Sequence, residues 1–302
     1  MKIGIDLGGS HVGVGLIDGN QIIGEIKDVS FTLEDRDHIE DVIIDTIVAF
    51  VNEILNENNL SLEDIELIGI ASPGTISNGV VVKAGNLGLT NFEIVKRLKE
   101  KLNVPIYIRN DGKCAALAEK KYGAMKDYDD CLFVNIGTGI GGAVFIGGKL
   151  LEPKRVSGFE LGHMVINKDG PLCTCGKHGC FETYGSIMCL RNRIRKTLNY
   201  EGDMSGKMIR EELIPKHRDE LLQDVTEYIS YLKIGLCNLI DIFEPEVLCF
   251  GGSFSYWSDT DLYKTLVAEI NKKDSTFNQE KPKIITAEFK NNAGIIGATI
   301  IS

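Results

Sequence analysis

The stretch IDLGGSHVGVGLIDG, residues 5–19, has a counterpart in VNIGTGIGGAVFIGG, residues 134–148. When the two are aligned, Gly8 meets Gly137, Gly13 meets Gly142 and Gly19 meets Gly148. In each copy an apolar, β-rich run leads into a glycine turn and a second apolar run. The simplest interpretation is two related domains with one glycine turn each. The alternative, that any two β-hairpins share this pattern, stays open at this point.

Strand-like and helix-like segments alternate along the chain. Residues 65–72 and 104–110 are short apolar runs typical of buried strands. Helices are expected at residues 37–58, 91–103, 111–123 and 291–302. This alternation predicts an α/β fold.

Charge and composition narrow the class of protein. The chain has 302 residues and a formal net charge of −10, which argues against a nucleic-acid partner because phosphate backbones are bound by basic faces. The N-terminal sequence is not a signal peptide, and no apolar run reaches the roughly 18 residues of a membrane span. We therefore expect a cytoplasmic protein without membrane contact, in which the eight cysteines are thiols.

Three glycine-rich turns after strands are candidate phosphate sites. DLGGS and NIGTG would present backbone N–H groups to anionic oxygens, with hydroxyls from Ser10 and Thr138. Asp6 would repel a bare phosphate, but it fits beside one if Mg²⁺ lies between them. With FGGSF at 250–254, the turns suggest a nucleotide bound by two domains. The chain lacks a Walker-type GxxxxGK[ST] loop, and its first strand lacks GxGxxG.

The segment LCTCGKHGC, residues 172–180, predicts a metal site. One imidazole and three thiolates, from His163, Cys173, Cys175 and Cys180, match the ligand set of a structural Zn²⁺. A disulfide would leave one sulfur over, and a redox pair usually has a two-residue spacer. His178 is an alternative ligand to His163.

Three carboxylates near these motifs are candidates for sugar chemistry. Glu160 and Glu182 flank the cysteine segment, so a bound metal would fix both of them, and carboxylates suit sugar hydroxyls. Asp111 follows a predicted strand, in the position where open α/β sheets bind ligands. It would either accept a proton from an attacking hydroxyl or simply cap the following helix.

Taken together, these motifs resemble the ROK family of sugar kinases, within the actin/hexokinase-like fold. The matching segments are IDLGGSHVGVGLID, FVNIGTGIGGAVFIGGK, RNDGKCAALAE, VLCFGGSFS and, most specifically, GFELGHMVINKDGPLCTCGKHGCFETYGS. The resemblance implies two ribonuclease H-like α/β domains with the active site in a cleft between them. The smaller would contain residues 1–111 and the helix at about 291–302, and the larger residues 112–290 with the zinc loop.

The resemblance also implies roles for individual residues. Asp111 would be the catalytic base for the sugar 6-hydroxyl. Sugar hydroxyls would be held by Asn86, Asn110, Asp111, Glu160, His163 and Glu182. ATP and Mg²⁺ would be bound through Asp6, Gly8, Gly9, Ser10, Gly137, Thr138 and Gly139, with the adenosine beside Gly252. The structural zinc would be held by His163, Cys173, Cys175 and Cys180.

The expected activity is ATP-dependent phosphorylation of a hexose, with glucose as the first candidate. The family often has Asn-Asp-Ala-Asn where this chain has Asn110-Asp111-Gly112-Lys113, Lys or Asn at the place of His11, and Trp near Leu89 in its glucokinases. An N-acetylmannosamine or N-acetylglucosamine kinase is therefore the alternative, followed by a non-catalytic sugar-binding protein. Repressors of the family carry a helix-turn-helix before the first phosphate motif, and here DLGGS starts at Asp6. Since the family is often dimeric, a homodimer is expected.

Overall fold

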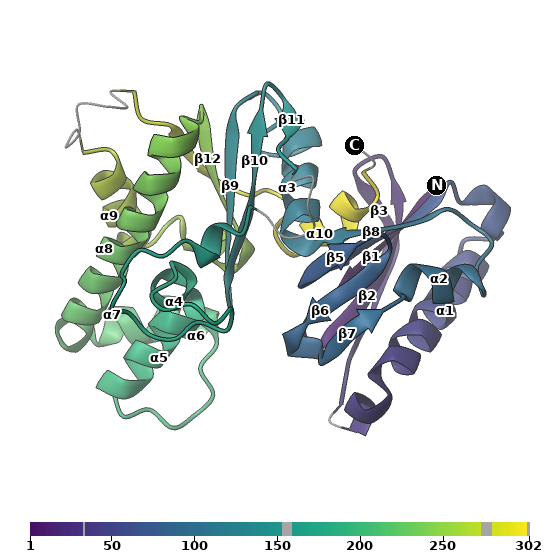
Figure 1. Cartoon of the computed structure of the whole chain (residues 1–302), viewed down its shortest axis with the longest axis horizontal. Coiled ribbons are helices and arrows are strands. Elements are labelled where there is room, and N and C mark those ends of the chain that lie inside the picture. The colour runs from purple at the N-terminus through teal and green to yellow at the C-terminus, as the bar shows by residue number, and fades with distance from the viewer. Residues whose placement is uncertain (33, 153–158, 273–279, 301–302) are drawn as a thin grey trace. The chain divides into compact units, whose positions relative to one another are not determined.

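The structure is a computed structural model that describes residues 1–32, 34–152, 159–272 and 280–300 (Figure 1). The chain divides into two compact units. Unit 1 contains Met1–Lys126 and the chain from Asn291 onward, and unit 2 contains Asp127–Glu152 and Phe159–Lys290. Both units are α/β, as the sequence predicts.

Unit 1 is built on a five-stranded sheet in the order β3-β2-β1-β4-β8. The strands β1, β4 and β8 run parallel, whereas β1–β2–β3 form an antiparallel meander. The strand bounds are β1 Lys2–Leu7, β2 His11–Asp18, β3 Gln21–Ser30, β4 Leu67–Ser72 and β8 Ile106–Asn110.

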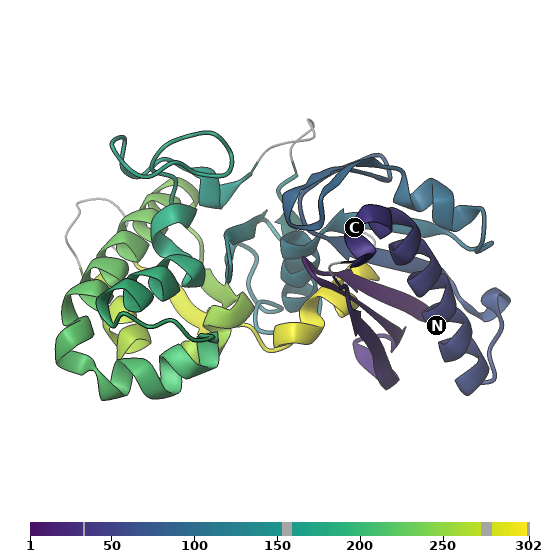
Figure 2. The same ribbon diagram turned by 90° about the horizontal axis from the view of Figure 1, so that it is seen from below.

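Helices cover both faces of this sheet (Figures 1 and 2). Ile3, Ile5 and Leu7 on β1 are fully buried in one cluster with the apolar side of α1. On the other face a Cβ at Gly4 or Gly69 would overlap the backbone of α10, so these glycines allow the helix to approach the sheet closely. The helices are α1 Ile39–Glu57, α2 Ile94–Lys99, α3 Asp111–Lys121 and α10 Ala293–Ala298, with short 3₁₀ turns η1 Glu34–His38, η2 Leu62–Asp64, η3 Gly85–Leu87 and η7 Lys290–Asn292.

The helix α3 packs against α10 inside unit 1. A Cβ at Gly297 of α10 would overlap the carbonyl of Cys114 in α3, so the two backbones are in direct contact. The family resemblance assigns residues 112–126 to the larger, second domain, whereas in the structure they belong to unit 1.

A small antiparallel sheet, β5-β6-β7, extends unit 1. Its strands are β5 Thr75–Ser77, β6 Val80–Ala84 and β7 Leu89–Phe92. Pairing of Phe92 with Val81 takes the start of the predicted helix 91–103 into β7, and α2 begins only at Ile94. The predicted helix was therefore too long at its N-terminus.

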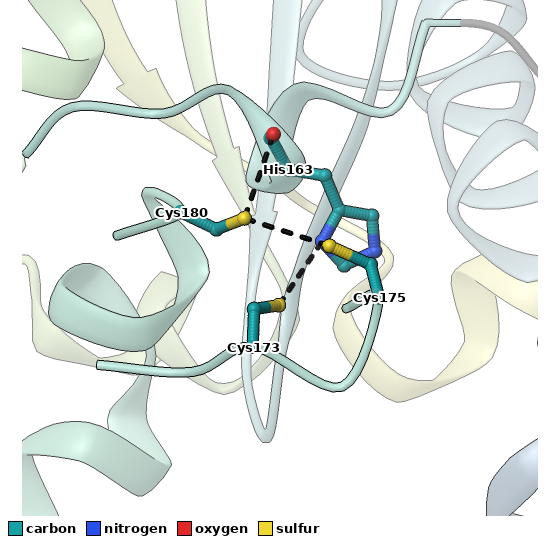
Figure 3. A group of neighbouring side chains, drawn as sticks. All are labelled: His163, Cys173, Cys175 and Cys180. Carbon is teal, nitrogen blue, oxygen red and sulfur yellow. Dashed lines mark hydrogen bonds between the residues drawn. The ribbon is translucent and has the colours of Figure 1, made fainter. Parts of the chain in front are cut away.

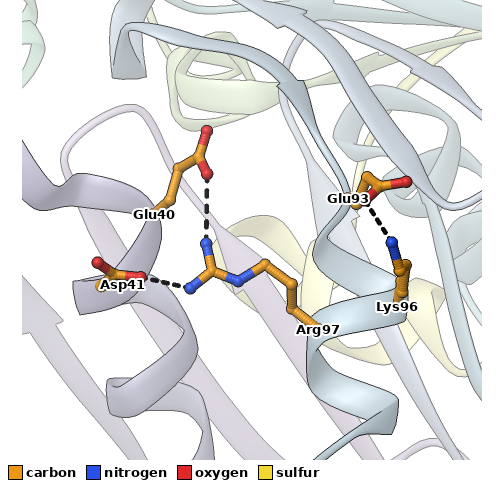
Figure 4. Close-up of polar contacts among 5 residues, drawn as sticks. All are labelled: Glu40, Asp41, Glu93, Lys96 and Arg97. Carbon is orange, nitrogen blue, oxygen red and sulfur yellow. Dashed lines mark hydrogen bonds and ion pairs between the residues drawn. The ribbon is translucent and has the colours of Figure 1, made fainter.

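Ion pairs fix α2 on α1 (Figure 4). Arg97 of α2 donates to Glu40 at 3.2 Å and also pairs with Asp41, both in the first turn of α1. On the same helix, Lys96 donates to Glu93 at 2.8 Å. Acidic residues in the first turn of a helix interact favourably with the helix dipole, so Glu40 and Asp41 stabilise α1 as well as the contact with Arg97.

Unit 2 repeats the sheet of unit 1, with the order β11-β10-β9-β12-β13. The strands β9, β12 and β13 are parallel, and β9–β10–β11 form the antiparallel meander. The bounds are β9 Cys131–Ile136, β10 Ile140–Ile146, β11 Lys149–Leu150, β12 Val247–Gly251 and β13 Lys283–Thr286. The equal order and direction confirm the repeat that the two glycine motifs predict.

The two hairpins differ in the length of their turn. In unit 1 the last pair of β1 and β2 is Leu7 with Val12, so four residues lie between these paired positions. In unit 2 the corresponding pair is Ile136 with Ile140, which leaves three connecting residues.

This difference corrects the alignment of the two motifs. Gly13 lies opposite Asp6, and the residue opposite Asn135, the counterpart of Asp6, is Gly141. The structural partner of Gly13 is therefore Gly141 and not Gly142. Sequence alignment without a gap could not show the inserted residue.

The core of unit 2 lies between β9, where Leu132, Val134 and Ile136 point to one side, and the helices that follow. The long α8 supplies Tyr228, whose hydroxyl donates to Gly185 O at 2.8 Å. The helices are α4 Glu182–Gly185, α5 Ile187–Thr197, α6 Gly206–Met208, α7 Ile214–Lys216, α8 Arg218–Phe243 and α9 Asp261–Ile270, with 3₁₀ turns η4 Leu161–His163 and η6 Gly252–Trp257 and a π turn η5 Ile209–Leu213.

Candidate functional site

The first glycine turn, residues 8–11, follows the central strand of unit 1. Gly8 N donates to His11 O at 2.9 Å, and Phe31 N donates to Ser10 O at 2.8 Å. The turn is therefore held by its own backbone and by β3. It lies at the carboxyl end of parallel strands, where open α/β sheets bind ligands.

Asn86 lies beside this turn. A Cβ added to Gly9 would be 3.2 Å from Asn86 Nδ2. Asn86 is exposed, whereas its neighbours Leu87 and Leu89 are buried in the core. The segment therefore presents an amide and no aromatic ring to this side of unit 1.

Two carboxylates approach each other near the same turn. Burial, and next the charge of Asp111, raise the pKa of Asp6 from its usual 3.8 to about 6, while His11 opposes this. Gly294 of α10 covers Asp6, since a Cβ there would lie 3.0 Å from Asp6 Cγ. A buried carboxylate whose pKa is raised by a neighbouring carboxylate is a suitable place for a cation.

The N-cap of α3 is Asn110, and Asp111 is the first residue of the helix. Asn110 Oδ1 accepts from Lys113 N at 3.3 Å, and its Nδ2 donates to Gly74 O at 3.3 Å. Asp111 Oδ1 accepts from Gly112 N at 2.8 Å. The expectation that Asp111 caps the helix is therefore wrong, because the amide of Asn110 takes that role.

The second glycine turn, residues 137–139, is held from outside as well as by its own backbone. Gly137 N donates to Gly139 O at 2.9 Å. The carboxylate of Glu182 accepts from Ile140 N at 2.9 Å, and Ile187 N donates to Gly137 O at 2.9 Å. Both ends of the turn are thus tied to the segment that contains α4 and the start of α5.

The third glycine turn, residues 251–253, packs on the end of β9. Gly252 has φ +64°, and a Cβ there would be 2.6 Å from Asn135 Oδ1, so both backbone conformation and space favour glycine. Ser253 Oγ donates to Ile136 O at 3.4 Å. The second and third turns therefore lie side by side in unit 2.

Four side chains converge in unit 2 as the cysteine spacing predicts. Figure 3 shows the imidazole of His163 and the sulfurs of Cys173, Cys175 and Cys180 facing one another. Their candidate ligand atoms all lie within 4.8 Å of one another. The Cys173 Sγ–His163 Nδ1 distance is 3.5 Å, and the Cys175 Sγ–Cys180 Sγ distance is 3.6 Å.

These separations fit a tetrahedral zinc ion. With Zn–S bonds of about 2.3 Å, tetrahedral sulfurs lie about 3.8 Å apart. The chemistry of the thiols agrees: burial raises the pKa of Cys180 to about 12, whereas the backbone N–H of Lys177 lowers that of Cys175. A bound cation would supply the charge needed to keep a buried thiolate such as Cys180 deprotonated.

Short backbone contacts give the metal loop, residues 172–180, its shape. Cys173 N donates to Lys177 O at 2.8 Å, and Gly176 N donates to Cys173 O at 2.9 Å. Lys177 Nζ also donates to His163 O at 2.7 Å, which joins the loop to the remaining ligand. The sequence therefore specifies the loop locally.

Two other residues near the loop have distinct positions. His178 Nδ1 lies 3.1 Å from Gly170 O, and this exposed histidine is outside the four-residue cluster. His163, and not His178, completes the ligand set. Glu160 is exposed, and its carbonyl accepts from His163 N at 3.0 Å.

The candidate site residues thus form two groups. Unit 1 contains Asp6, Gly8, Gly9, Ser10, Asn86, Asn110 and Asp111. Unit 2 contains Gly137, Thr138, Gly139, Glu160, His163, Cys173, Cys175, Cys180, Glu182 and Gly252. Local contacts bring residues together within each group.

A model of the ROK family matches residues 2–302. The chain belongs to the ROK family. Its α/β architecture agrees with the solved structure of the ROK hexokinase from Thermus thermophilus, at a TM-score of 0.81 and 27% identity, over 98% of this chain and 96% of that one.

Relatives of this ROK protein include both enzymes and regulators. The glucokinase of Thermotoga maritima is 26% identical over 99% of this chain and 96% of its own length. The xylose repressor of Caldicellulosiruptor bescii is 28% identical over 99% of this chain and 78% of its own length. Family membership alone therefore does not decide between catalysis and sugar-dependent regulation.

Within the described residues, no helix of this ROK protein is both long and apolar enough to cross a membrane.

Two contacts that support the site could not be predicted from the sequence. The backbone N–H of Ile140 binds Glu182, and the carbonyl of Gly74 binds Asn110. Both use main-chain atoms, which leave no mark in residue type.

Proposed function

We propose that this chain is an ATP-dependent sugar kinase that phosphorylates the 6-hydroxyl of a hexose. Glucose is the first candidate substrate. The observation that carries the proposal is the position of Asp111 at the carboxyl end of β8, next to Asp6, with the helix-capping role taken by Asn110. Helix capping therefore does not account for Asp111 at this position.

The chemistry asked of Asp111 is limited. Phosphoryl transfer passes through a loose transition state, so positioning and charge stabilisation supply most of the rate. Asp111 would orient the sugar hydroxyl and accept its proton as the oxygen attacks the terminal phosphorus. A positioned base of this kind contributes roughly 10²- to 10⁴-fold.

The nucleotide would be bound by the glycine turns. Backbone N–H groups, with Ser10 and Thr138, would hold the phosphates, and Gly252 would lie near the adenosine. Mg²⁺ supplies charge neutralisation when it is bound with ATP. The acidic neighbourhood of Asp6 and Asp111 supports a cation there.

Each unit contains candidate ligands for sugar hydroxyls. In unit 1 these are Asn86 and Asn110. In unit 2, Glu160, His163 and Glu182 would contribute, and a zinc ion on the cysteine cluster would fix the position of His163. Because Nδ1 of His163 faces Cys173, Nε2 is the ring nitrogen left for a sugar hydroxyl.

Substrate choice depends on the segment around Asn86. Residues 86–91 contain no aromatic side chain, and Leu89 is buried. A site without an aromatic ring here would suit glucose and would also accept a 2-acetamido group, which makes N-acetylmannosamine and N-acetylglucosamine the alternative substrates.

The test is ADP release from Mg-ATP with glucose, mannose, fructose, allose, N-acetylglucosamine, N-acetylmannosamine and xylose. We expect one hexose to be turned over far faster than the others. Xylose is the matched control, because it is a pyranose like glucose without the 6-hydroxymethyl group and has no 6-hydroxyl to phosphorylate.

Similarity to a xylose repressor favours a second candidate, a sugar-binding regulator. Ligand-induced melting shifts on the same panel separate the two. Sugar binding without ADP release from any hexose would contradict the kinase and support the regulator.

A further inference from the structure

Two segments next to the His/Cys cluster of unit 2 contact Ile140. This residue follows the turn directly and begins β10. Its N–H donates to Glu182, and its carbonyl lies against Gly162, where a Cβ would overlap it. The N–H and the carbonyl of Ile140 are therefore both in contact with residues near the His/Cys cluster.

Both contacts come from residues within two positions of a member of the His/Cys cluster. Glu182 is two residues after Cys180 and is the first residue of α4. Gly162 precedes His163 in η4. The four-residue cluster therefore holds the two segments that grip Ile140, because two of its members belong to those segments.

Glu182 also limits the space beside the turn. A Cβ at Gly139 would overlap Glu182 Oε2, so the carboxylate lies directly on the turn backbone. A carboxylate has two oxygens, and the bond to Ile140 uses Oε2. The same side chain is thus able to serve the turn with one oxygen and a sugar hydroxyl with the other.

We propose that Glu182 is a positioning residue for the second glycine turn, and that the metal cluster fixes this turn through Glu182 and Gly162. Metal loss would then weaken nucleotide binding as well as sugar binding. The statement about nucleotide rests on the proposed kinase function, whereas the statement about the turn does not.

The test compares Glu182→Ala, Glu182→Gln and Glu160→Ala with the wild type by hydrogen–deuterium exchange of peptides covering residues 137–142. Glu160 is the matched control, because it is an exposed candidate sugar ligand next to the same loop. Glu182→Ala should speed exchange about tenfold, since one hydrogen bond to Ile140 N is lost. Glu182→Gln keeps an acceptor oxygen and should stay near wild type, and Glu160→Ala should not change exchange at all.

The metal is tested in the wild-type chain, so the conclusion does not depend on any variant folding. Chelation should raise exchange at 137–142, and added zinc should restore protection. The proposal would be overturned if exchange at 137–142 stayed as slow as in the untreated wild type, either after chelation or in a folded Glu182→Ala variant.

Binding of Mg-ADP without sugar then tests the nucleotide part. We expect a several-fold weaker Kd for Glu182→Ala than for Glu160→Ala. Equal Kd values would overturn the link to nucleotide. If no form of the protein bound nucleotide, the proposed kinase function would fail, and the exchange data would still decide the role of Glu182.

Discussion

The first and second glycine turns occupy the same place in two copies of one sheet, yet they are supported differently. The first has four residues and is held by backbone bonds from His11 and Phe31 within its own meander. The second has three and is held by Glu182 and Ile187 from a later part of the chain.

The residues behind the turns differ in the same sense. Asp6 precedes the first turn and interacts with Asp111, whereas its counterpart Asn135 is neutral and lies beside Gly252. Unit 1 therefore places two carboxylates near its turn, whereas in unit 2 the segment next to the His/Cys cluster braces the turn through Glu182.

The largest effect should follow from changing the charge of unit 1. Asp111→Asn is expected to lower kcat roughly 10²- to 10⁴-fold with a small change in melting temperature, because the base is lost and the Asn110 cap is kept. Steady-state kinetics and thermal melting measure the two effects.

The matched control is Asp261→Asn. Asp261 is also the first residue of its helix, α9, and its partner is Arg218 on the surface of unit 2. Its removal should leave kcat within about twofold. An Asp111→Asn enzyme that turned over as fast as Asp261→Asn would rule out Asp111 as the base.

Removing the brace of unit 2 should have the next largest effect. His163→Ala is expected to lose bound zinc and to destabilise the protein by more than about 2 kcal/mol. His178→Ala should keep the zinc and the stability of the wild type, because His178 lies outside the cluster. Metal analysis by mass spectrometry and urea unfolding measure this. Equal zinc content in the two variants would show that the cluster is not the metal site.

Asp6→Asn replaces Asp6 by asparagine, the residue found at the equivalent position of unit 2, Asn135. Because the pKa of Asp6 is raised from 3.8 to about 6, its charged form is disfavoured in the folded state, and the associated stability is lost as pH rises through about 6. The variant should therefore be more stable than the wild type by about 2 kcal/mol near neutral pH, with the difference fading toward pH 4. Urea unfolding across this range measures it.

The control is Asp28→Asn, since Asp28 is nearby and its side chain is 53% exposed. We expect Asp28→Asn to change the free energy of unfolding by less than about 0.5 kcal/mol, as is usual for an exposed side chain. A difference between Asp6→Asn and wild type that did not vary with pH would contradict the effect of burial on Asp6.

The smallest effect is expected from adding one methyl group to each turn, by Gly139→Ala in the second and Gly9→Ala in the first. Gly139→Ala should displace Glu182 and cost about 1 kcal/mol, the usual net value of one hydrogen bond. Gly9→Ala meets Asn86 at 3.2 Å, a contact that a small side-chain movement relieves. If urea unfolding showed a larger loss of stability for Gly9→Ala than for Gly139→Ala, the conclusion that the two turns are supported differently would be wrong.

Local signals were enough to predict much of this molecule. Alternating apolar residues identified both hairpins, and glycine marked both turns. The ligand set of His163 and three cysteines was predictable because donors close in sequence meet without help from distant packing. The family followed from the same motifs.

Other features depended on contacts that residue types do not record. The extra residue in the first turn shifts β2 by one position, and only the pairing of Gly13 with Asp6 reveals it. Asn110 and Asp111 are both good helix caps, so their roles were set by the backbone and not by propensity. The bond from Ile140 to Glu182 spans 42 residues of chain.

The close fit of α10 on β1 and β4 has a consequence for biosynthesis. The ribosome makes Gly4 and Gly69 early, but the helix that presses on them, residues 293–298, emerges only after all of unit 2. In the nascent chain, the sheet of unit 1 therefore lacks α10 over Gly4 and Gly69 until unit 2 has been translated. Unit 2 is therefore able to complete its fold before unit 1 does, although most of unit 1 is translated first.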